Sequence, residues 1–233
     1  MEKKKNKTIV LIVAMSKELR LLLPLIKDLE THSIEGVTFY EGCVGNNRVI
    51  ASQCGIGKVN AAIGAYSAIK CFSPDLVINT GVAGGASVDI NVMDVVVADK
   101  IAYHDVWCGP GTEWGMAAGC PLYFECNDYY NTIAHNLEVD NVVPGLICSG
   151  DQFIASIETI EQIKTNFPNV VAVDMESAAI AQVCYKQGVP FICLRVISDS
   201  PGASHNNSAQ YENFWEEAPE HVFDIVSKLL NQI

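Results

Sequence analysis

Three carboxylates and one arginine lie in or just after apolar stretches of this sequence, where enzymes often keep acid–base groups. Glu18 follows the apolar stretch 8–14, and Glu176 follows the apolar stretch 170–173. Asp199 follows a third apolar stretch, which contains Arg195. A carboxyl group in apolar surroundings can have its pKa moved towards neutrality, which suits a general acid or base. Arg195 needs a buried partner, because an unpaired charge inside an apolar strand would be costly.

Each carboxylate also has a purely structural explanation when it is considered alone. Glu18, Asp174 and Glu176 could be acids favoured by the dipole at a helix start. Asp199, in the sequence SDSPG, could be a turn residue. A functional interpretation therefore depends on the elements that would bring these side chains together.

The stretch 170–200 predicts a strand, a helix and a second strand. Residues 170–173 are β-branched or small and apolar, and apolar residues follow Glu176 at helical spacing. Gly188 and Pro190 end the helix, and residues 191–197 form another apolar run. This order indicates a parallel sheet with a right-handed crossover. Such sheets bind small molecules at the carboxyl ends of their strands, where Glu176 and Asp199 would lie.

The rest of the chain predicts a regular alternation of strands and helices. The expected strands are 8–14, 37–43 and 48–53 (a hairpin), 75–80, 92–98 and 142–148. The expected helices are 17–29 with Ser16 as cap and Pro24 inside, 58–71, 126–138, 156–166 with Ser156 as cap, and 210–232. Residues 106–118 form a long irregular segment whose apolar content predicts a lid or a subunit interface.

Several polar or glycine-rich features follow apolar strands and predict a single pocket. They are Glu18, a glycine-rich turn at 81–85, the segment around Phe153, Glu176 and Asp199. Glycines let the backbone approach a ligand closely, although a tight turn alone would also explain 81–85. Neither this turn nor the G-x-G at 55–57 completes a nucleotide-binding motif.

Composition predicts one α/β domain and argues against two classes of partner. The chain has 233 residues, 49% of them hydrophobic, and we expect a single domain at 8–233 after a disordered tip at 1–7. A net charge of -12 argues against nucleic acid or an anionic membrane as partner, and no run is long enough to span a bilayer. The nine cysteines include no C-x-x-C pair and predict reduced thiols in the cytoplasm. The five histidines lack metal-ligand spacing, so we expect no metal and no cofactor.

Six motifs, in order along the chain, resemble those of one enzyme family. They are AMSKE, CGIGKVNAA, INTGVAGG, SGDQFI, AVDMESAAIA and RVISDS. The chain resembles the 5′-methylthioadenosine/S-adenosylhomocysteine nucleosidases, within the nucleoside phosphorylase superfamily. This resemblance implies a single-domain, three-layer α/β fold with a central twisted, partly closed mixed sheet flanked by helices. It also implies a cytoplasmic homodimer in methionine salvage that cleaves a 5′-substituted adenosine without a cofactor.

The resemblance also implies roles for particular residues. Asp199 would protonate purine N7, Glu18 would activate water, and Arg195 would position that water or its carboxylate partner, for which we expect Glu18. Glu176 would bind the ribose hydroxyls, because a carboxylate accepts several hydrogen bonds. The pKa of Asp199 would be raised by burial beside Phe153 and by the charges of Glu18 and Glu176; His205 is the alternative acid. The other substrate contacts would be Met15, Ile56, Val82, Gly84, Ile154, Met175, Ser198 and Tyr211.

The chain departs from the family pattern at three places. Val82 replaces a frequent serine, Pro201 has no N–H to offer Asp199, and residues 106–118 match poorly. The 5′ substituent is therefore open, and futalosine is an alternative substrate. Two other functions also stay open: a purine nucleoside phosphorylase, which would need cations for phosphate, and a non-catalytic nucleoside-binding module.

Overall fold

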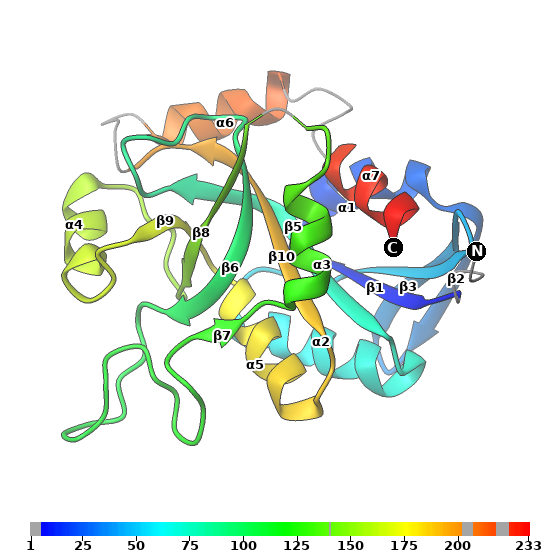
Figure 1. Cartoon of the computed structure of the whole chain (residues 1–233), viewed down its shortest axis with the longest axis horizontal. Helices are drawn as coiled ribbons and strands as arrows, with labels where there is room; N and C mark the ends of the chain where they lie inside the picture. The colour runs from blue at the N-terminus through cyan, green and yellow to red at the C-terminus, as the bar shows by residue number, and fades with distance from the viewer. Residues whose placement is uncertain (1–5, 140, 202–206, 218–223) are drawn as a thin grey trace.

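The computed structural model describes residues 6–139, 141–201, 207–217 and 224–233, and it consists of a large mixed sheet with helices around it (Figure 1). The strands are β1 (Thr8–Val13), β2 (Lys27–Ile34), β3 (Val37–Val44), β4 (Asn47–Gln53), β5 (Leu76–Gly85), β6 (Val95–Tyr103), β7 (Phe124–Glu125), β8 (Val142–Ser149), β9 (Val170–Asp174) and β10 (Phe191–Asp199). The helices are α1 (Ser16–Leu22), α2 (Lys58–Phe72), α3 (Asp128–His135), α4 (Ile157–Asn166), α5 (Ser177–Gln187), α6 (Asn207–Glu217) and α7 (Asp224–Gln232).

The sheet closes on itself over half of its strands. Its order is β10-β6-β8-β9-β5-β1-β4-β3-β2, and β5 also pairs with β10. The pairs β1–β5, β5–β10, β6–β8 and β8–β9 are parallel, whereas β6–β10 and β5–β9 are antiparallel. The predicted partly closed mixed sheet is therefore confirmed, with β1, β4, β3 and β2 as an open extension.

The strands that carry the site are apolar along nearly their whole length. All nine residues of β10 are buried, and β1 is buried after its first residue. Continuous apolar runs of this kind are typical of strands covered on both faces. The strand–helix–strand unit predicted at 170–200 is present as β9, α5 and β10.

Helices pack around the sheet and fix the ends of these strands. Helices α2 and α5 contact each other, and α5 also contacts β6, β8 and β10 (Figure 1). Helix α5 ends at Gly188, whose positive φ of 66° provides the expected cap. Ser156 caps α4 as predicted, since its hydroxyl accepts a hydrogen bond from the Thr159 N–H. Helix α6 contacts β10, and it lies over that strand's carboxyl end in Figure 1.

The helix predicted at 17–29 is wrong beyond Leu22. Pro24 lies in a short 3₁₀ turn, Leu23–Leu25, because proline lacks the N–H that a continuing helix would use. Residues 27–34 instead form β2, which pairs antiparallel with β3. Tertiary pairing thus overrides the local helical pattern. Ser16 is the first helical residue, and the cap position belongs to Met15.

The glycine-rich turn predicted at 81–85 is part of strand β5. Gly84 and Gly85 pair with Val173 and Ala172 of β9, so the strand continues through the glycines and joins β5 to β9. The long helix predicted at 210–232 corresponds to α6 and α7, and residues 218–223 lie outside the described residues. Residues 106–118 are irregular, as predicted.

The ends of the chain show two further features. Residues 1–5 of the predicted N-terminal tip lie outside the described residues, and Lys7 donates hydrogen bonds to the side chains of Asn47 and Tyr130. Within the described ranges, no helix combines the length and the apolar character that a bilayer crossing requires.

Candidate active site

A cavity opens at the carboxyl ends of β1, β5, β9 and β10. Its lining consists of Ala14, Met15, Glu18, Ile56, Val82, Ala83, Gly84, Gln152, Phe153, Ile154, Val173, Asp174, Met175, Glu176, Ser198, Asp199 and Tyr211. The structure therefore brings every predicted site residue to one cavity except Arg195. Sequence reasoning missed Ala14, Ala83, Gln152, Val173 and Asp174 as lining residues.

Glu18 is buried at this cavity and is held by three backbone groups. One carboxyl oxygen accepts hydrogen bonds from the N–H groups of Ala14, at 3.0 Å, and Met15, at 2.8 Å. The other accepts one from the N–H of Val82, at 3.0 Å. Burial raises the pKa of Glu18, and Arg195 and the three N–H groups oppose that rise. A carboxylate fixed in this way, with a raised pKa, suits a general base.

The residue before Val82 must be glycine for Glu18 to occupy this position. Gly81 has a φ of 143°, and a Cβ there would overlap the Glu18 carboxyl group and lie 2.6 Å from Nη1 of Arg195. The family-typical serine at 82 would add a hydroxyl, but the contact to Glu18 uses only the backbone of Val82. The departure at Val82 therefore leaves the position of Glu18 unchanged.

Asp199 is the second buried carboxyl group of the cavity. It accepts hydrogen bonds from the Ser198 hydroxyl, at 2.7 Å, and from the side-chain amide of Asn207, at 3.1 Å. Burial raises the pKa of Asp199, and these two hydrogen bonds oppose the rise. The expected contributions of Glu18 and Glu176 to this shift are wrong, because burial alone produces it. His205, the alternative acid, lies outside the described residues.

Glu176 lies at the start of α5 and is the third carboxyl group of the cavity. It accepts a hydrogen bond from the Gly57 N–H at 2.9 Å, which ties it to the start of α2. Burial raises the pKa of Glu176 to about 7, although Arg195, 3.7 Å away, favours its ionised form. Asp174 contributes to the rise through repulsion between like charges.

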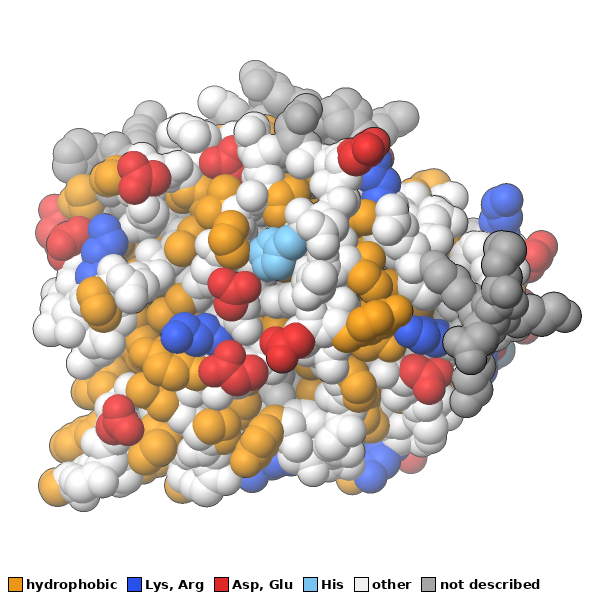
Figure 2. Space-filling model, viewed as in Figure 1, with side chains coloured by type: hydrophobic (Ala, Val, Ile, Leu, Met, Phe, Trp, Pro, Cys, Tyr) orange, Lys and Arg blue, Asp and Glu red, His pale blue; other side chains and the backbone are white. Residues whose placement is uncertain are grey.

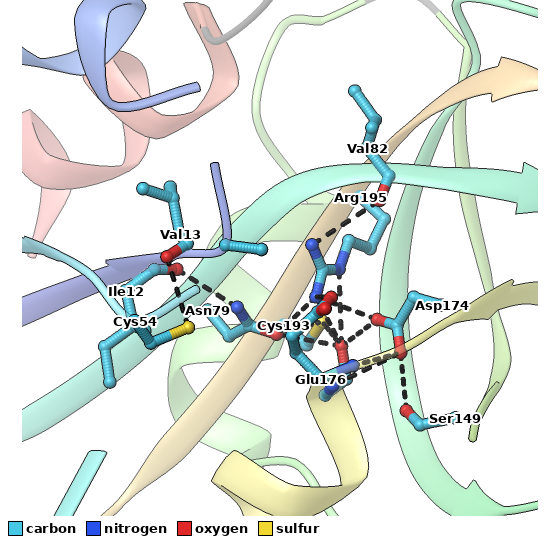
Figure 3. A network of polar contacts seen from close by, with 12 residues as sticks. Ile12, Val13, Cys54, Asn79, Val82, Ser149, Asp174, Glu176, Cys193 and Arg195 are labelled. Carbon is cyan, nitrogen blue, oxygen red and sulfur yellow. Dashed lines mark hydrogen bonds and ion pairs between the residues drawn. The ribbon is translucent and has the colours of Figure 1, made fainter. Parts of the chain in front are cut away.

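Arg195 lies beneath the cavity in a buried polar network (Figure 3). Its guanidinium group pairs with Asp174 at 2.8 Å and donates to the Asn79 side-chain oxygen at 2.9 Å and to the Ser177 hydroxyl at 3.0 Å. The expected pairing of Arg195 with Glu18 is therefore wrong. Burial acts to lower the pKa of Arg195, but the neighbouring carboxylates, Asp174 first, raise it above its usual value.

Sequence reasoning missed most of this network. Asp174 also accepts hydrogen bonds from the hydroxyls of Ser149, at 2.5 Å, and Ser177. Asn79 lies in the largely apolar strand β5, and Ser149 ends the largely apolar strand β8. Polar residues inside apolar strands are the signal that could have identified them, since a buried polar group needs a partner.

Two aromatic residues border the cavity beside Asp199. The rings of Phe153 and Tyr211 meet edge to face with their centroids 5.6 Å apart, and the Tyr211 hydroxyl donates to the sulfur of Met15 at 3.3 Å. Phe153 is 48% exposed and lines the cavity, so its side chain is accessible to a ligand.

The described part of the cavity contains no lysine, arginine or histidine in its lining. In the same described ranges, no group of three or more histidine, cysteine, aspartate or glutamate residues is arranged to hold a metal ion. The chemistry that this lining can perform is therefore proton transfer by carboxyl groups around a largely apolar ligand.

Comparison with known proteins identifies the family. The Phosphorylase superfamily profile matches residues 8–231. The 5′-methylthioadenosine/S-adenosylhomocysteine nucleosidase of Staphylococcus carnosus is 39% identical, over 96% of this chain and 99% of that protein. The crystal structure of S-adenosylhomocysteine nucleosidase from Streptococcus pyogenes in complex with 5-methylthiotubericidin has a TM-score of 0.92 at 36% identity, covering 100% of this chain and 99% of that one.

The nucleosidase of Streptococcus pneumoniae with a transition-state inhibitor is also similar, with a TM-score of 0.90 at 35% identity, covering 96% of this chain and 98% of that one. The sequence comparison and the structural comparison thus both extend over nearly the whole chain and indicate the same family. The chain belongs to the Phosphorylase superfamily and, within it, to the 5′-methylthioadenosine/S-adenosylhomocysteine nucleosidases.

Proposed function

We propose that this protein hydrolyses the N-ribosyl bond of a 5′-substituted adenosine, 5′-methylthioadenosine or S-adenosylhomocysteine, and releases adenine and the 5′-thio-ribose. The observation that carries this proposal is the pair of buried carboxyl groups, Glu18 and Asp199, in one cavity whose described lining holds no cation. The names of the similar proteins support the substrate class.

Cleavage of a purine–ribose bond needs a proton on the leaving base, because an anionic purine leaves poorly. In the proposed mechanism Asp199 delivers this proton to N7. Its raised pKa keeps a proton available nearer to neutral pH than an ordinary aspartate would. Negative charge near the sugar would stabilise the cationic, oxocarbenium-like transition state.

Glu18 would hold and activate the attacking water. Its hydrogen bonds to three backbone N–H groups fix the carboxylate, so the water could bind in one position. The proton that Glu18 removes leaves a hydroxide-like oxygen to attack the sugar carbon as the purine departs.

The remaining lining residues would bind the substrate. Glu176 would accept hydrogen bonds from the ribose hydroxyls, and Met175 would pack beneath the sugar. Phe153 would stack on the purine, whose edge the Ile154 backbone would contact. Arg195 does not line the cavity but reaches its lining through Asp174, Glu176 and the carbonyl oxygen of Val82. It would position the two carboxylates. The other predicted contacts, Met15, Ile56, Val82, Gly84, Ser198 and Tyr211, line the same cavity.

Phosphorolysis is the main alternative within the same superfamily. A phosphate nucleophile would need cations near Glu18 and Val82, whereas the described lining offers none and Glu18 would repel the anion. This difference favours water as the nucleophile.

The test is a panel of purine nucleosides with the released base identified by chromatography. It would include 5′-methylthioadenosine, S-adenosylhomocysteine, 5′-deoxyadenosine, adenosine, inosine and futalosine, each with and without phosphate. We expect adenine release from the 5′-thio substrates at a rate independent of phosphate. Ribose-1-phosphate formation would assign a phosphorylase instead, and binding without base release would assign a non-catalytic module.

We further propose that the protein is a cytoplasmic homodimer. Val59, Ile63 and Tyr66 lie at helical spacing on α2 and are exposed, as are Trp107 and Trp114, which stack in the segment between β6 and β7. Figure 2 shows hydrophobic side chains gathered over the lower left, where that segment lies in Figure 1. A second copy would cover these surfaces. Sedimentation of the wild type and of Ile63→Glu should give a dimer and a monomer; a monomeric wild type would contradict this proposal.

A further inference from the structure

We propose that Asn207 is a positioning residue for Asp199: its side-chain amide holds the carboxyl group of Asp199 and the carbonyl group of Ile154 in one arrangement. The proposal rests on the proposed function, in which Asp199 is the acid. It assigns a role in that reaction to a residue on α6 that does not line the cavity.

The geometry of Asn207 connects three parts of the site. Its amide nitrogen lies 3.1 Å from a carboxyl oxygen of Asp199 and 3.1 Å from the carbonyl oxygen of Ile154. An amide NH₂ group has two hydrogens, so both hydrogen bonds can form together. Asn207 is 1% exposed, and a buried amide with defined partners holds them in place.

The segment after Asp199 explains why a side chain is needed here. Pro201 has no N–H, so the residue two positions after the acid cannot donate to it. The Ser200 N–H is also committed, since it donates to the Gln210 side chain at 3.0 Å. Asn207 supplies the donor from the first turn of α6, and with Gln210 it attaches this helix to the end of β10 at two points.

The electrostatic surroundings of Asp199 determine in which direction its pKa should change when Asn207 is replaced. Its hydrogen bonds with Ser198 and Asn207 lower its pKa, and burial raises it. The other titratable groups of the cavity are Glu18, Asp174, Glu176 and Tyr211, with Arg195 beneath it. Loss of the Asn207 donor leaves the ionised carboxylate less stabilised. Asp199 should then lose its proton at a higher pH than in the wild type.

The first test is Asn207→Ala with adenine release measured as a function of pH. We expect kcat to fall about tenfold or more, because a freely rotating carboxyl group spends less time aligned with N7. The alkaline limb of the kcat profile should move to higher pH. KM should change less than kcat, because the lining residues are unchanged.

Asn207→Asp is a second variant of nearly the same shape, which keeps the test valid if the alanine variant does not fold. An added carboxylate cannot donate to Asp199 and repels its ionised form, so the alkaline limb should move further than in Asn207→Ala.

Asn47→Ala is the matched control. Asn47 is also buried and donates to two backbone carbonyls, those of Leu230 and Ile233, away from the cavity. It should lower thermal stability and leave the pH profile of kcat unchanged.

The outcomes separate this inference from the proposed function. A wild type that releases no purine base would overturn the proposed function. An active wild type together with folded Asn207 variants of normal kcat and unshifted alkaline limb would overturn the positioning role alone. A loss of activity that follows the loss of folded protein, without a pH shift, would also overturn it.

Discussion

At the scale of single residues, the proposed chemistry depends on how burial changes the pKa of two carboxyl groups. Asp199 and Glu18 lie in one cavity, and burial raises the pKa of each. Their hydrogen bonds differ: Glu18 has three backbone donors, whereas Asp199 has two side-chain donors. Glu18 is therefore fixed by the backbone, and Asp199 by Ser198 and α6.

Asp199→Asn should retain substrate binding and lose turnover by a factor of ~10² to 10⁴, the usual contribution of general acid catalysis. Asparagine can still hydrogen-bond to a purine but has no acid proton to deliver. In the wild type, burial raises the pKa of Asp199, so activity should persist above the pKa of an ordinary aspartate and fall as the pH rises through the shifted value. Single-turnover rates measured across pH would test the loss of turnover and the pH dependence, and titration with a substrate analogue would test whether binding is retained.

The control for this variant is Asp89→Asn, at an exposed position away from the cavity lining. It should keep the wild-type rate and profile. If Asp199→Asn also kept them, the acid would have to be another group.

Glu18→Gln should lose most turnover and still bind a substrate analogue, because glutamine cannot take a proton from water. The substitution should also weaken binding of the side chain at this position. In glutamine one carboxyl oxygen is replaced by an NH₂ group, which would face a backbone N–H that now donates a hydrogen bond to that oxygen. Calorimetric titration with an analogue, beside a turnover assay, separates binding from chemistry. Unchanged turnover would remove Glu18 from its proposed role.

At the scale of elements, strand β5 connects the two halves of the site. It pairs with β1, β10 and β9, and its Gly81 lies where Glu18 and Arg195 approach the backbone. The strand therefore sets how closely Glu18 and the buried ionic network can pack together.

Gly81→Ala should abolish most activity, because its Cβ would overlap the Glu18 carboxyl group and displace the base. Gly36→Ala is the matched control: Gly36 also has a positive φ, 83°, but a Cβ there would meet nothing within 4 Å. Both variants should lose roughly 1–3 kcal/mol of stability from backbone strain, and Gly81→Ala should lose more because of the overlap with Glu18. Only Gly81→Ala should lose turnover, as measured by adenine release and thermal unfolding. Equal turnover in the two variants would contradict the close packing at Gly81.

At the scale of the whole molecule, the buried carboxyl groups make folding depend on pH. Glu176 has an ordinary pKa of 4.5 in the unfolded chain and about 7 in the folded protein. The folded state therefore binds more protons than the unfolded state between these values. The stability that the protonated form contributes is complete below the unfolded pKa and is lost as the pH rises through the folded one.

Glu176→Gln should reduce this dependence, because glutamine has no proton to lose. The stability of the variant relative to that of the wild type, as the difference between their free energies of unfolding, should be greater at about pH 8 than at about pH 5 by roughly 1–3 kcal/mol. Denaturant titrations at the two pH values provide the measurement, with the exposed Glu35→Gln as control. A wild type and variant with parallel pH dependences would show that Glu176 titrates near its ordinary value.

The sequence by itself determined the order of most elements and the grouping of three carboxylates at one site. Apolar runs with short polar ends specify the central strands, and a parallel arrangement puts their carboxyl ends at one edge. Glu18, Glu176 and Asp199 could be grouped for that reason, without any knowledge of their contacts. The resemblance to a family then supplied their chemical roles, which local patterns could not provide.

Tertiary structure decided what depends on distant partners. Residues 27–34 become a strand because β3 is available to pair with them, and Gly84 and Gly85 stay in a strand because β9 lies beside them. Arg195 pairs with Asp174 because the end of β9 reaches the buried guanidinium group. Asn207 reaches Asp199 from a helix that follows it by several residues. None of these contacts has a local sequence signature, since hydrogen bonds and ion pairs depend on distances that only the folded chain sets.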